Sequence, residues 1–359
     1  MRSQTRLVAA SIASSLGRAG DSASGGGGFG LAGAGARGSI RPHMPTDAIL
    51  STARQFLGVD PTVSVTLEQI KRGASGRTIV RVKTKVHEPF VGIHWTDERE
   101  DNEQYIPVGH FLKKCRLRVP AILYESPKRH VVLVEDIGDV DLLSLKGLPF
   151  AERLPLYRSA LEQVDRLFYA KPEKDFVLMP PFDAALYRWE QEYFFEFLVE
   201  DHLGLKADAL RQNPAFVDLA DRLGKVSRHL VHRDFQSQNL LVKDGQVWLI
   251  DFQGLRRGRQ EYDIASLVFD PYLDHTPAER EALLGLWEEI SDEQPETRLF
   301  HECAAQRLMQ ALGAYANIVH NRGDEWYRPH IATAARLLKE VTDGTPLEGP
   351  LAPVFAALH

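Results

Sequence analysis

The sequence is poor in cysteine and lacks a long apolar run. Only two of its 359 residues are cysteines, Cys115 and Cys303, and neither belongs to a zinc-ligand pattern. This scarcity excludes a disulfide framework and a structural zinc site, and it predicts a reducing, cytoplasmic compartment. No stretch of 18 consecutive apolar residues occurs, so we expect no membrane-spanning helix.

The chain also lacks an excess of positive charge. It carries 43 Lys and Arg against 49 Asp and Glu, a formal net charge of −6. This balance argues against a nucleic-acid or anionic-membrane partner. Hydrophobic residues make up 44% and charged residues 26%, which excludes a wholly disordered, collagen-like or coiled-coil chain. A length of 359 residues allows two domains, or one large one, with a sizeable core.

The first 43 residues are the part of the sequence that cannot form a core. They hold a single acidic residue, Asp21, a run of four glycines and many serines and alanines. We predict a disordered leader over 1–43, or a true translation start at Met44. The stretch 7–16 is weakly similar to a signal or transit peptide, but its serines dilute the apolar run.

The remaining chain divides into a strand-rich part and a helix-rich part. Alternating apolar residues predict a strand over 78–84, and three further short β-prone runs follow up to residue 134, interrupted by one helix over 102–115. After Gly138 most apolar residues recur at helical spacing. We therefore expect an α+β fold, with a small antiparallel sheet and one helix in 44–137 and a mainly helical domain in 138–359.

Residues 240–250 depart from the helical pattern of the second half. Two β-prone runs, 240–243 and 246–250, are joined by Asp244 and Gly245. An Asp-Gly pair is typical of a type I′ turn, because both central positions of that turn need a positive φ. The sequence therefore predicts a β-hairpin.

The predicted hairpin brings oxygen-bearing side chains to one end. Its register places Asn239 opposite Ile250, so Asn239 and Asp251 leave the hairpin together, with Asp234 a short loop away. Magnesium takes oxygen ligands and is commonly completed by nucleotide phosphates. We therefore predict Asn239 and Asp251 as metal ligands. Asp234, beside Arg233, is the predicted base for phosphoryl transfer from ATP to a small-molecule hydroxyl.

These residues resemble the catalytic loop and metal segment of the protein-kinase-like superfamily. The resemblance rests on His232-Arg233-Asp234, then Asn239 after four intervening residues, and then Asp251-Phe252-Gln253-Gly254. No APE signature follows, and the stretch 262–267, YDIASL, is instead similar to the aminoglycoside phosphotransferase family. In that family the aspartate corresponding to Asp263 braces the catalytic loop.

Within that family the chain most resembles the bacterial anomeric kinases of N-acetylmuramate and N-acetylglucosamine. The similar segments are 133–139, 191–205, 251–253 and 306–319, and the resemblance covers roughly 70–339. It implies a bilobal protein-kinase-like fold, ATP and Mg²⁺ as cofactors, and phosphorylation of an amino sugar at its anomeric hydroxyl in cell-wall recycling. We expect a monomer whose partners are ATP and a small-molecule acceptor.

The resemblance also implies a nucleotide site in the strand-rich half. Gly73, Ser75 and Gly76 form a short loop that could cover phosphates with its amides, although an ordinary hairpin turn fits the same residues. Glu135 and Ile137, where a strand ends, correspond to the segment that contacts adenine through its backbone. A plain strand-to-loop transition is the alternative there.

One position departs from the kinase pattern. Protein kinases place a phosphate-binding lysine on the third strand, paired with a helix glutamate. Residues 90–95 contain no lysine, although Glu103 could still be the helix glutamate. This departure keeps open a second hypothesis, a catalytically silent nucleotide-binding module.

The candidates for acceptor binding belong to no specific motif. Glu192 lies on an acidic helix face, and Arg256 and Arg257 follow the metal segment. Glutamate could bind sugar hydroxyls or an amine, and arginine could bind a carboxylate. A solvated face and an exposed loop explain the same residues equally simply. An aminoglycoside or choline-type acceptor therefore remains an alternative on the same scaffold.

Overall fold

The computed structural model describes the chain from Met44 to Leu358 with four short gaps. The described ranges are 44–70, 77–97, 99–225, 228–291 and 296–358. The predicted leader, 1–43, and the loop residues Gly73, Ser75 and Gly76 lie outside them.

The described residues form two compact units. The first contains the chain up to Glu100 together with Ile122–Asp136, and the second contains Asp101–Ala121 together with the chain from Ile137 onward. The segment Asp101–Ala121 thus makes its contacts within the second unit, although it lies between two stretches of the first.

The first unit is built on one antiparallel sheet, as the sequence predicts. The strands are β1 (Thr66–Gln69), β2 (Thr78–Lys83), β3 (Phe90–His94), β4 (Ile122–Ser126) and β5 (Val131–Glu135), hydrogen bonded in the order β1-β2-β3-β5-β4. Helix α2 (Pro45–Leu57) packs on this sheet with Ile49 in the core. A Cβ atom at Gly92 of β3 would lie 2.4 Å from Ile49 Cγ2, so glycine allows this close approach.

The helix predicted over 102–115 is present in two parts. A 3₁₀ turn, η2 (Glu100–Gln104), precedes helix α3 (Tyr105–Lys114). Tyr105 packs on Phe252 with 4.8 Å between ring centroids, which connects α3 to the segment that follows the predicted hairpin. The buried face of α3 carries Val108, Phe111 and Leu112, at the spacing expected for an amphipathic helix.

The second unit is mainly helical. Its longer helices are α4 (Phe150–Phe168), α5 (Ala184–Phe194), the π-helix η4 (Phe195–His202), α7 (Pro214–Lys225), α8 (Gln260–Val268), α9 (Pro277–Ser291), α10 (Thr297–Arg322), α11 (Arg328–Thr342) and α12 (Glu348–Ala357), with the short α6 (Asp208–Gln212) before α7. None of the helices in the described ranges is long and apolar enough to span a membrane.

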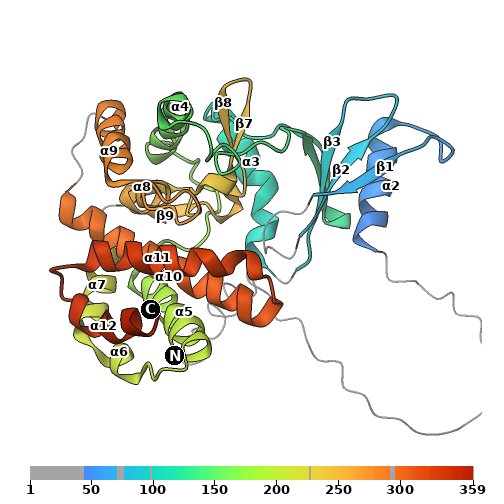
Figure 1. Cartoon of the computed structure of the whole chain (residues 1–359). Coiled ribbons are helices and arrows are strands. Elements are labelled where there is room, and N and C mark those ends of the chain that lie inside the picture. The colour runs from blue at the N-terminus through green and yellow to red at the C-terminus, as the bar shows by residue number, and fades with distance from the viewer. Residues whose placement is uncertain (1–43, 71–76, 98, 226–227, 292–295, 359) are drawn as a thin grey trace, which may run out of the picture. The chain divides into compact units, whose positions relative to one another are not determined.

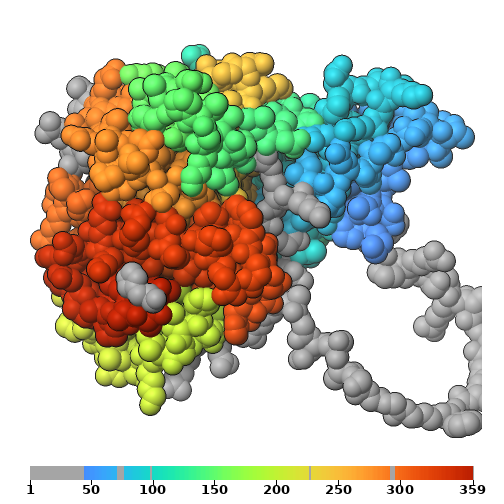
Figure 2. All heavy atoms as spheres, viewed as in Figure 1, coloured from blue at the N-terminus to red at the C-terminus, as the bar shows by residue number. Residues whose placement is uncertain are grey.

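Helix α10 is the central element of this unit. It packs against α5, α8 and α11 (Figure 1), and almost all of its residues from Cys303 to Val319 are buried. A Cβ atom at Gly313 would lie 2.8 Å from Tyr193 Cδ1 and 2.9 Å from the Tyr193 carbonyl oxygen, so glycine lets α10 approach α5 closely. Figure 2 shows the red and orange atoms of the C-terminal helices directly against the yellow-green atoms of α5–α7.

The second unit also contains two short antiparallel β-ribbons. Strand β6 (His229–Val231) pairs with β9 (Arg256–Gly258), and β7 (Leu240–Lys243) pairs with β8 (Gln246–Leu249). The second ribbon is the predicted hairpin, with Lys243 opposite Gln246. Asp244 has a φ of 53° and Gly245 a φ of 69°, the positive values that a type I′ turn requires. The predicted turn and register are both confirmed.

Candidate active site

The loop between β6 and β7 is held by two buried carboxylates. Asp263 of α8 accepts hydrogen bonds from the backbone N–H groups of His232, at 2.6 Å, and Arg233, at 2.8 Å. Asp270 accepts one from the Ser237 N–H at 2.7 Å. Burial raises the pKa of Asp263 to about 7, against the lowering effect of its two backbone donors. The loop around Asp234 is thereby fixed from outside on both sides.

The structure brings the Asp234 loop, Asn239 and Asp251 to the same end of the hairpin. Asn239 Nδ2 donates to the Asp234 carbonyl oxygen at 2.9 Å, and the Ile250 N–H donates to the Asn239 carbonyl oxygen at 3.1 Å. Asp251 follows with a φ of 62°, a conformation that aspartate tolerates better than most residues. Gln253 Nε2 donates to Asp251 Oδ1 at 3.0 Å.

The charges of Asp234 and Asp251 act on the buried imidazole of His232. Burial lowers the pKa of His232, while the negative charges of Asp234 and Asp251 act in the opposite direction. Both carboxylates are therefore close enough to act on one ring, and the ring itself is neutral at pH 7.

The donor set at this end suits a hard divalent cation. Asn239 donates through its amide nitrogen to the Asp234 carbonyl, so this hydrogen bond does not engage its amide oxygen. The Asp251 carboxylate supplies a second oxygen. Across the described ranges no group of three or more His, Cys, Asp and Glu side chains is arranged to hold a metal ion. One amide and one carboxylate fit Mg²⁺, which usually keeps waters and takes phosphate oxygens as further ligands.

The Asp234 side chain is accessible and lies between two arginines. It is 28% exposed, with Arg233 Nε 4.0 Å from Oδ2 and Arg307 Nη2 3.8 Å from Oδ1. Arg233 adopts a positive φ of 80°, and its side chain is buried. The carboxylate can therefore be reached by a small molecule while its charge stays balanced.

A buried glutamate, Glu190, was not predicted as a site residue from the sequence. Glu190 of α5 is fully buried and accepts hydrogen bonds from the Tyr262 hydroxyl at 3.0 Å and from Gln306 Nε2 at 3.1 Å. Burial raises its pKa, and Arg233 is the strongest of the groups that lower it. The sequence contains one indication of a buried charged cluster here. Arg307, a charged residue, falls on the apolar face of the last long predicted helix.

The predicted nucleotide residues in the described ranges lie at the end of β5, just after it, and in the η2 turn. Glu135 ends β5 opposite Phe90, Ile137 is buried, and Glu103 is exposed on the η2 turn. In β2, Arg81 Nε forms an ion pair with Asp136 Oδ2 at 2.5 Å. The nucleotide-binding roles of Glu135, Ile137 and Glu103 stay predictions.

The predicted acceptor residues differ in their surroundings, and among them Arg256 responds to the charge of Asp234. Glu192 is exposed and pairs with Arg211 at 2.6 Å. Arg256 is buried, with its guanidinium 5.4 Å from the Phe182 ring centroid, and burial lowers its pKa to about 9. Arg257 is exposed on β9. Their roles in acceptor binding stay predictions.

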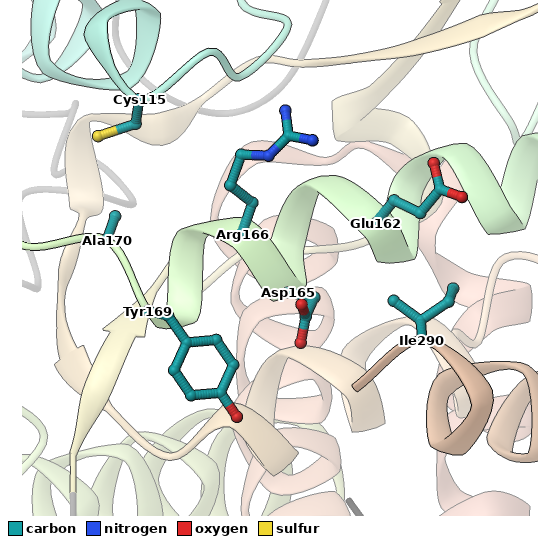
Figure 3. Close-up of a pocket in the computed structure, with 7 residues that line it drawn as sticks. All are labelled: Cys115, Glu162, Asp165, Arg166, Tyr169, Ala170 and Ile290. Atoms are coloured by element: carbon teal, nitrogen blue, oxygen red, sulfur yellow. The ribbon is translucent and has the colours of Figure 1, made fainter. Parts of the chain in front are cut away.

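A hollow of about 600 Å³ lies elsewhere in the second unit. It is lined by Glu162, Asp165 and Arg166 from α4, with Cys115 and Ile290 at its sides (Figure 3). None of the residues assigned to phosphoryl transfer lines it. We assign this hollow no part in the chemistry.

The chain matches a known family over most of its length. The model of the phosphotransferase enzyme family matches residues 66–300. An N-acetylmuramate/N-acetylglucosamine kinase of Pseudomonas putida is 27% identical over 285 residues, which cover 75% of this chain and 82% of that protein. A kinase of the same name from Neisseria meningitidis is 27% identical over 273 residues, covering 70% and 79%.

Solved structures confirm the predicted protein-kinase-like fold. A choline/ethanolamine kinase family protein of Mesorhizobium loti matches with a TM-score of 0.59 at 14% identity, covering 86% of this chain and 99% of its own. A thermostable aminoglycoside phosphotransferase, in complex with ADP and hygromycin B, matches with a TM-score of 0.55 at 16% identity, covering 83% and 99%. At these identities the likeness concerns the fold.

Proposed function

Since this chain belongs to the phosphotransferase enzyme family and is a small-molecule kinase, we propose that it transfers the γ-phosphoryl group of ATP to an amino sugar. The proposed acceptor is N-acetylmuramate or N-acetylglucosamine, and the proposed acceptor atom is the anomeric hydroxyl oxygen. The names of the two relatives support the acceptor. The observation that carries the proposal is the placement of the Asp234 loop, Asn239 and Asp251 at one end of a hairpin.

In the proposed reaction Asp234 is the base. Its carboxylate accepts the proton of the anomeric hydroxyl as that oxygen bonds to the γ-phosphorus and the bond to the ADP oxygen breaks. Asn239 and Asp251 would hold Mg²⁺, which neutralises phosphate charge when bound. The Asp234 carboxyl group is accessible, at 28% exposure. The hydrogen bond from Asn239 to the Asp234 carbonyl links the proposed metal ligand to the backbone of the proposed base.

Phosphoryl transfer depends mostly on position and charge, and the loop is built for both. The backbone around Asp234 is fixed by Asp263 and Asp270, and the carboxylate faces Arg233 and Arg307. A base held in place in this way loses little freedom on reaching the transition state.

An acceptor panel tests the proposal. The purified full chain is incubated with ATP, Mg²⁺ and, separately, N-acetylmuramate, N-acetylglucosamine, glucosamine, choline and kanamycin, and ADP release and the ³¹P spectrum of the product are recorded. We expect turnover with an N-acetylated amino sugar and a phosphorus signal coupled to the anomeric proton. Turnover with kanamycin or choline alone would show that the acceptor is an aminoglycoside or choline and not an N-acetylated amino sugar. ATP binding without turnover on any acceptor would favour the silent nucleotide-binding module.

A further inference from the structure

Arg307 is held in one position by neighbours on three sides. Its Nε donates to Ser266 Oγ at 2.8 Å, its Nη2 donates to Gln236 Oε1 at 2.9 Å, and its Nη1 donates to Gln310 Oε1. The residue is only 7% exposed. It comes from α10, beyond the region matched by the family model, which ends at residue 300.

The fixed guanidinium faces the proposed base. Arg307 Nη2 lies 3.8 Å from Asp234 Oδ1, while Arg233 Nε lies 4.0 Å from Asp234 Oδ2. Each carboxylate oxygen therefore has its own cation, and rotation of the carboxylate would move an oxygen away from its charge. Because Arg307 also holds Gln236, two residues after the base, it fixes both the loop and the side chain.

A buried acid, Glu190, acts on the charges of Arg233 and Arg307. A buried charge is costly unless another charge compensates it. Glu190 is fully buried, and it interacts electrostatically with both Arg233 and Arg307. Gln306, next to Arg307 in the chain, donates to Glu190 Oε2. A third buried guanidinium, that of Arg256, responds to the charges of Arg233, Glu190 and Asp234.

We propose that Arg307 is a positioning residue for phosphoryl transfer, which holds the Asp234 carboxylate in its reactive orientation. This inference rests on the proposed role of Asp234 as the base. Arg307 contacts the carboxylate of the proposed base and the loop that carries it, so its loss should affect the chemical step and leave nucleotide binding intact.

The test compares three variants in the full chain. Arg307→Met removes the charge at similar size, and Arg307→Lys keeps the charge with fewer donors. Arg153→Met is the matched control, because Arg153 is 6% exposed and donates to the Leu148 carbonyl at 3.1 Å and to the Tyr157 hydroxyl at 2.5 Å, in a different part of the unit. Its loss should lower thermal stability without a specific loss of turnover.

We expect kcat to fall about 100-fold in Arg307→Met, the typical effect of a misplaced reacting group, with the KM for ATP unchanged. Arg307→Lys should recover part of kcat, and Arg153→Met should keep the wild-type kcat. A kcat for Arg307→Met equal to that of Arg153→Met would overturn the inference. So would equal losses in Arg307→Met and Arg307→Lys, because a purely structural arginine predicts no rescue by charge.

A crystal structure of Arg307→Lys or Arg307→Met separates this inference from the proposed function. If the wild type turns over no acceptor of the panel, the proposed function fails, and the position of the Asp234 carboxylate then decides the inference. A rotated carboxylate in Arg307→Met, restored in Arg307→Lys, supports the inference. A carboxylate that keeps its place in Arg307→Met contradicts it.

Discussion

Replacement of Asp263 by Asn is the substitution whose effect on stability is most sharply defined. The carboxylate accepts two backbone N–H bonds, from His232 and Arg233, in a fully buried site. An asparagine at this position offers one oxygen to one donor and turns its NH₂ group toward the other. At pH 5 the unmatched donor should destabilise the fold by about 1–3 kcal/mol.

The pH dependence of that loss follows from the raised pKa. Asp263 has an ordinary pKa of 3.8 and a folded-state pKa of about 7. Between these values the folded protein holds a proton that the unfolded chain has lost, so wild-type stability falls as pH rises through the window and levels off above it. At a limiting slope of about 1.4 kcal/mol per pH unit, the stability advantage of the wild type over Asp263→Asn should fall by about 2 kcal/mol from pH 5 to pH 7 and by less than about 0.5 kcal/mol from pH 7 to pH 8.

Urea unfolding followed by tryptophan fluorescence measures this difference at pH 5, 6, 7 and 8. Other titrating groups are common to both proteins and cancel in the comparison. A difference that stays constant across these pH values, or that grows as pH rises, would refute the reasoning about Asp263.

Three further predictions concern the supporting structure. Gly313→Ala should lower the free energy of unfolding by about 1–3 kcal/mol in thermal denaturation, because a Cβ would lie 2.8 Å from an α5 side chain. The control is Gly285→Ala, where a Cβ would meet no atom within 4 Å, and it should stabilise α9 by up to about 1 kcal/mol. Gly245→Val should cost about 1–2 kcal/mol in urea unfolding, because φ is 69° at this turn, and an unchanged midpoint would contradict the turn assignment. In a double-mutant cycle of Glu190→Gln and Arg307→Met, the double variant should lose less stability than the sum of the single losses, and strict additivity would argue against charge compensation.

The hairpin was predictable because its determinants are local. Asp244 and Gly245 specify the turn, and the turn fixes the register that places Asn239 opposite Ile250. A short sequence window therefore contained the arrangement of Asn239 and Asp251.

The buried charged cluster was not predictable because it is assembled from distant segments. Glu190 lies on α5 and Gln306, the neighbour of Arg307, on α10, more than a hundred residues apart, and their hydrogen bond depends on how the two helices pack. From the sequence, Glu190 belongs to the same acidic helix face as Glu192. The structure buries the first and exposes the second, and Arg256 is likewise buried although it follows a loop.

The central claim, that Asp234 is the base of a phosphoryl transfer, is tested most directly by the rate of ADP release at saturating ATP and N-acetylated amino sugar. Asp234→Asn should lower kcat by about 10²–10⁴-fold while ATP binding is retained, and Asp218→Asn, an exposed position on α7, should match the wild type. An Asp234→Asn variant that releases ADP at the wild-type rate would contradict the account.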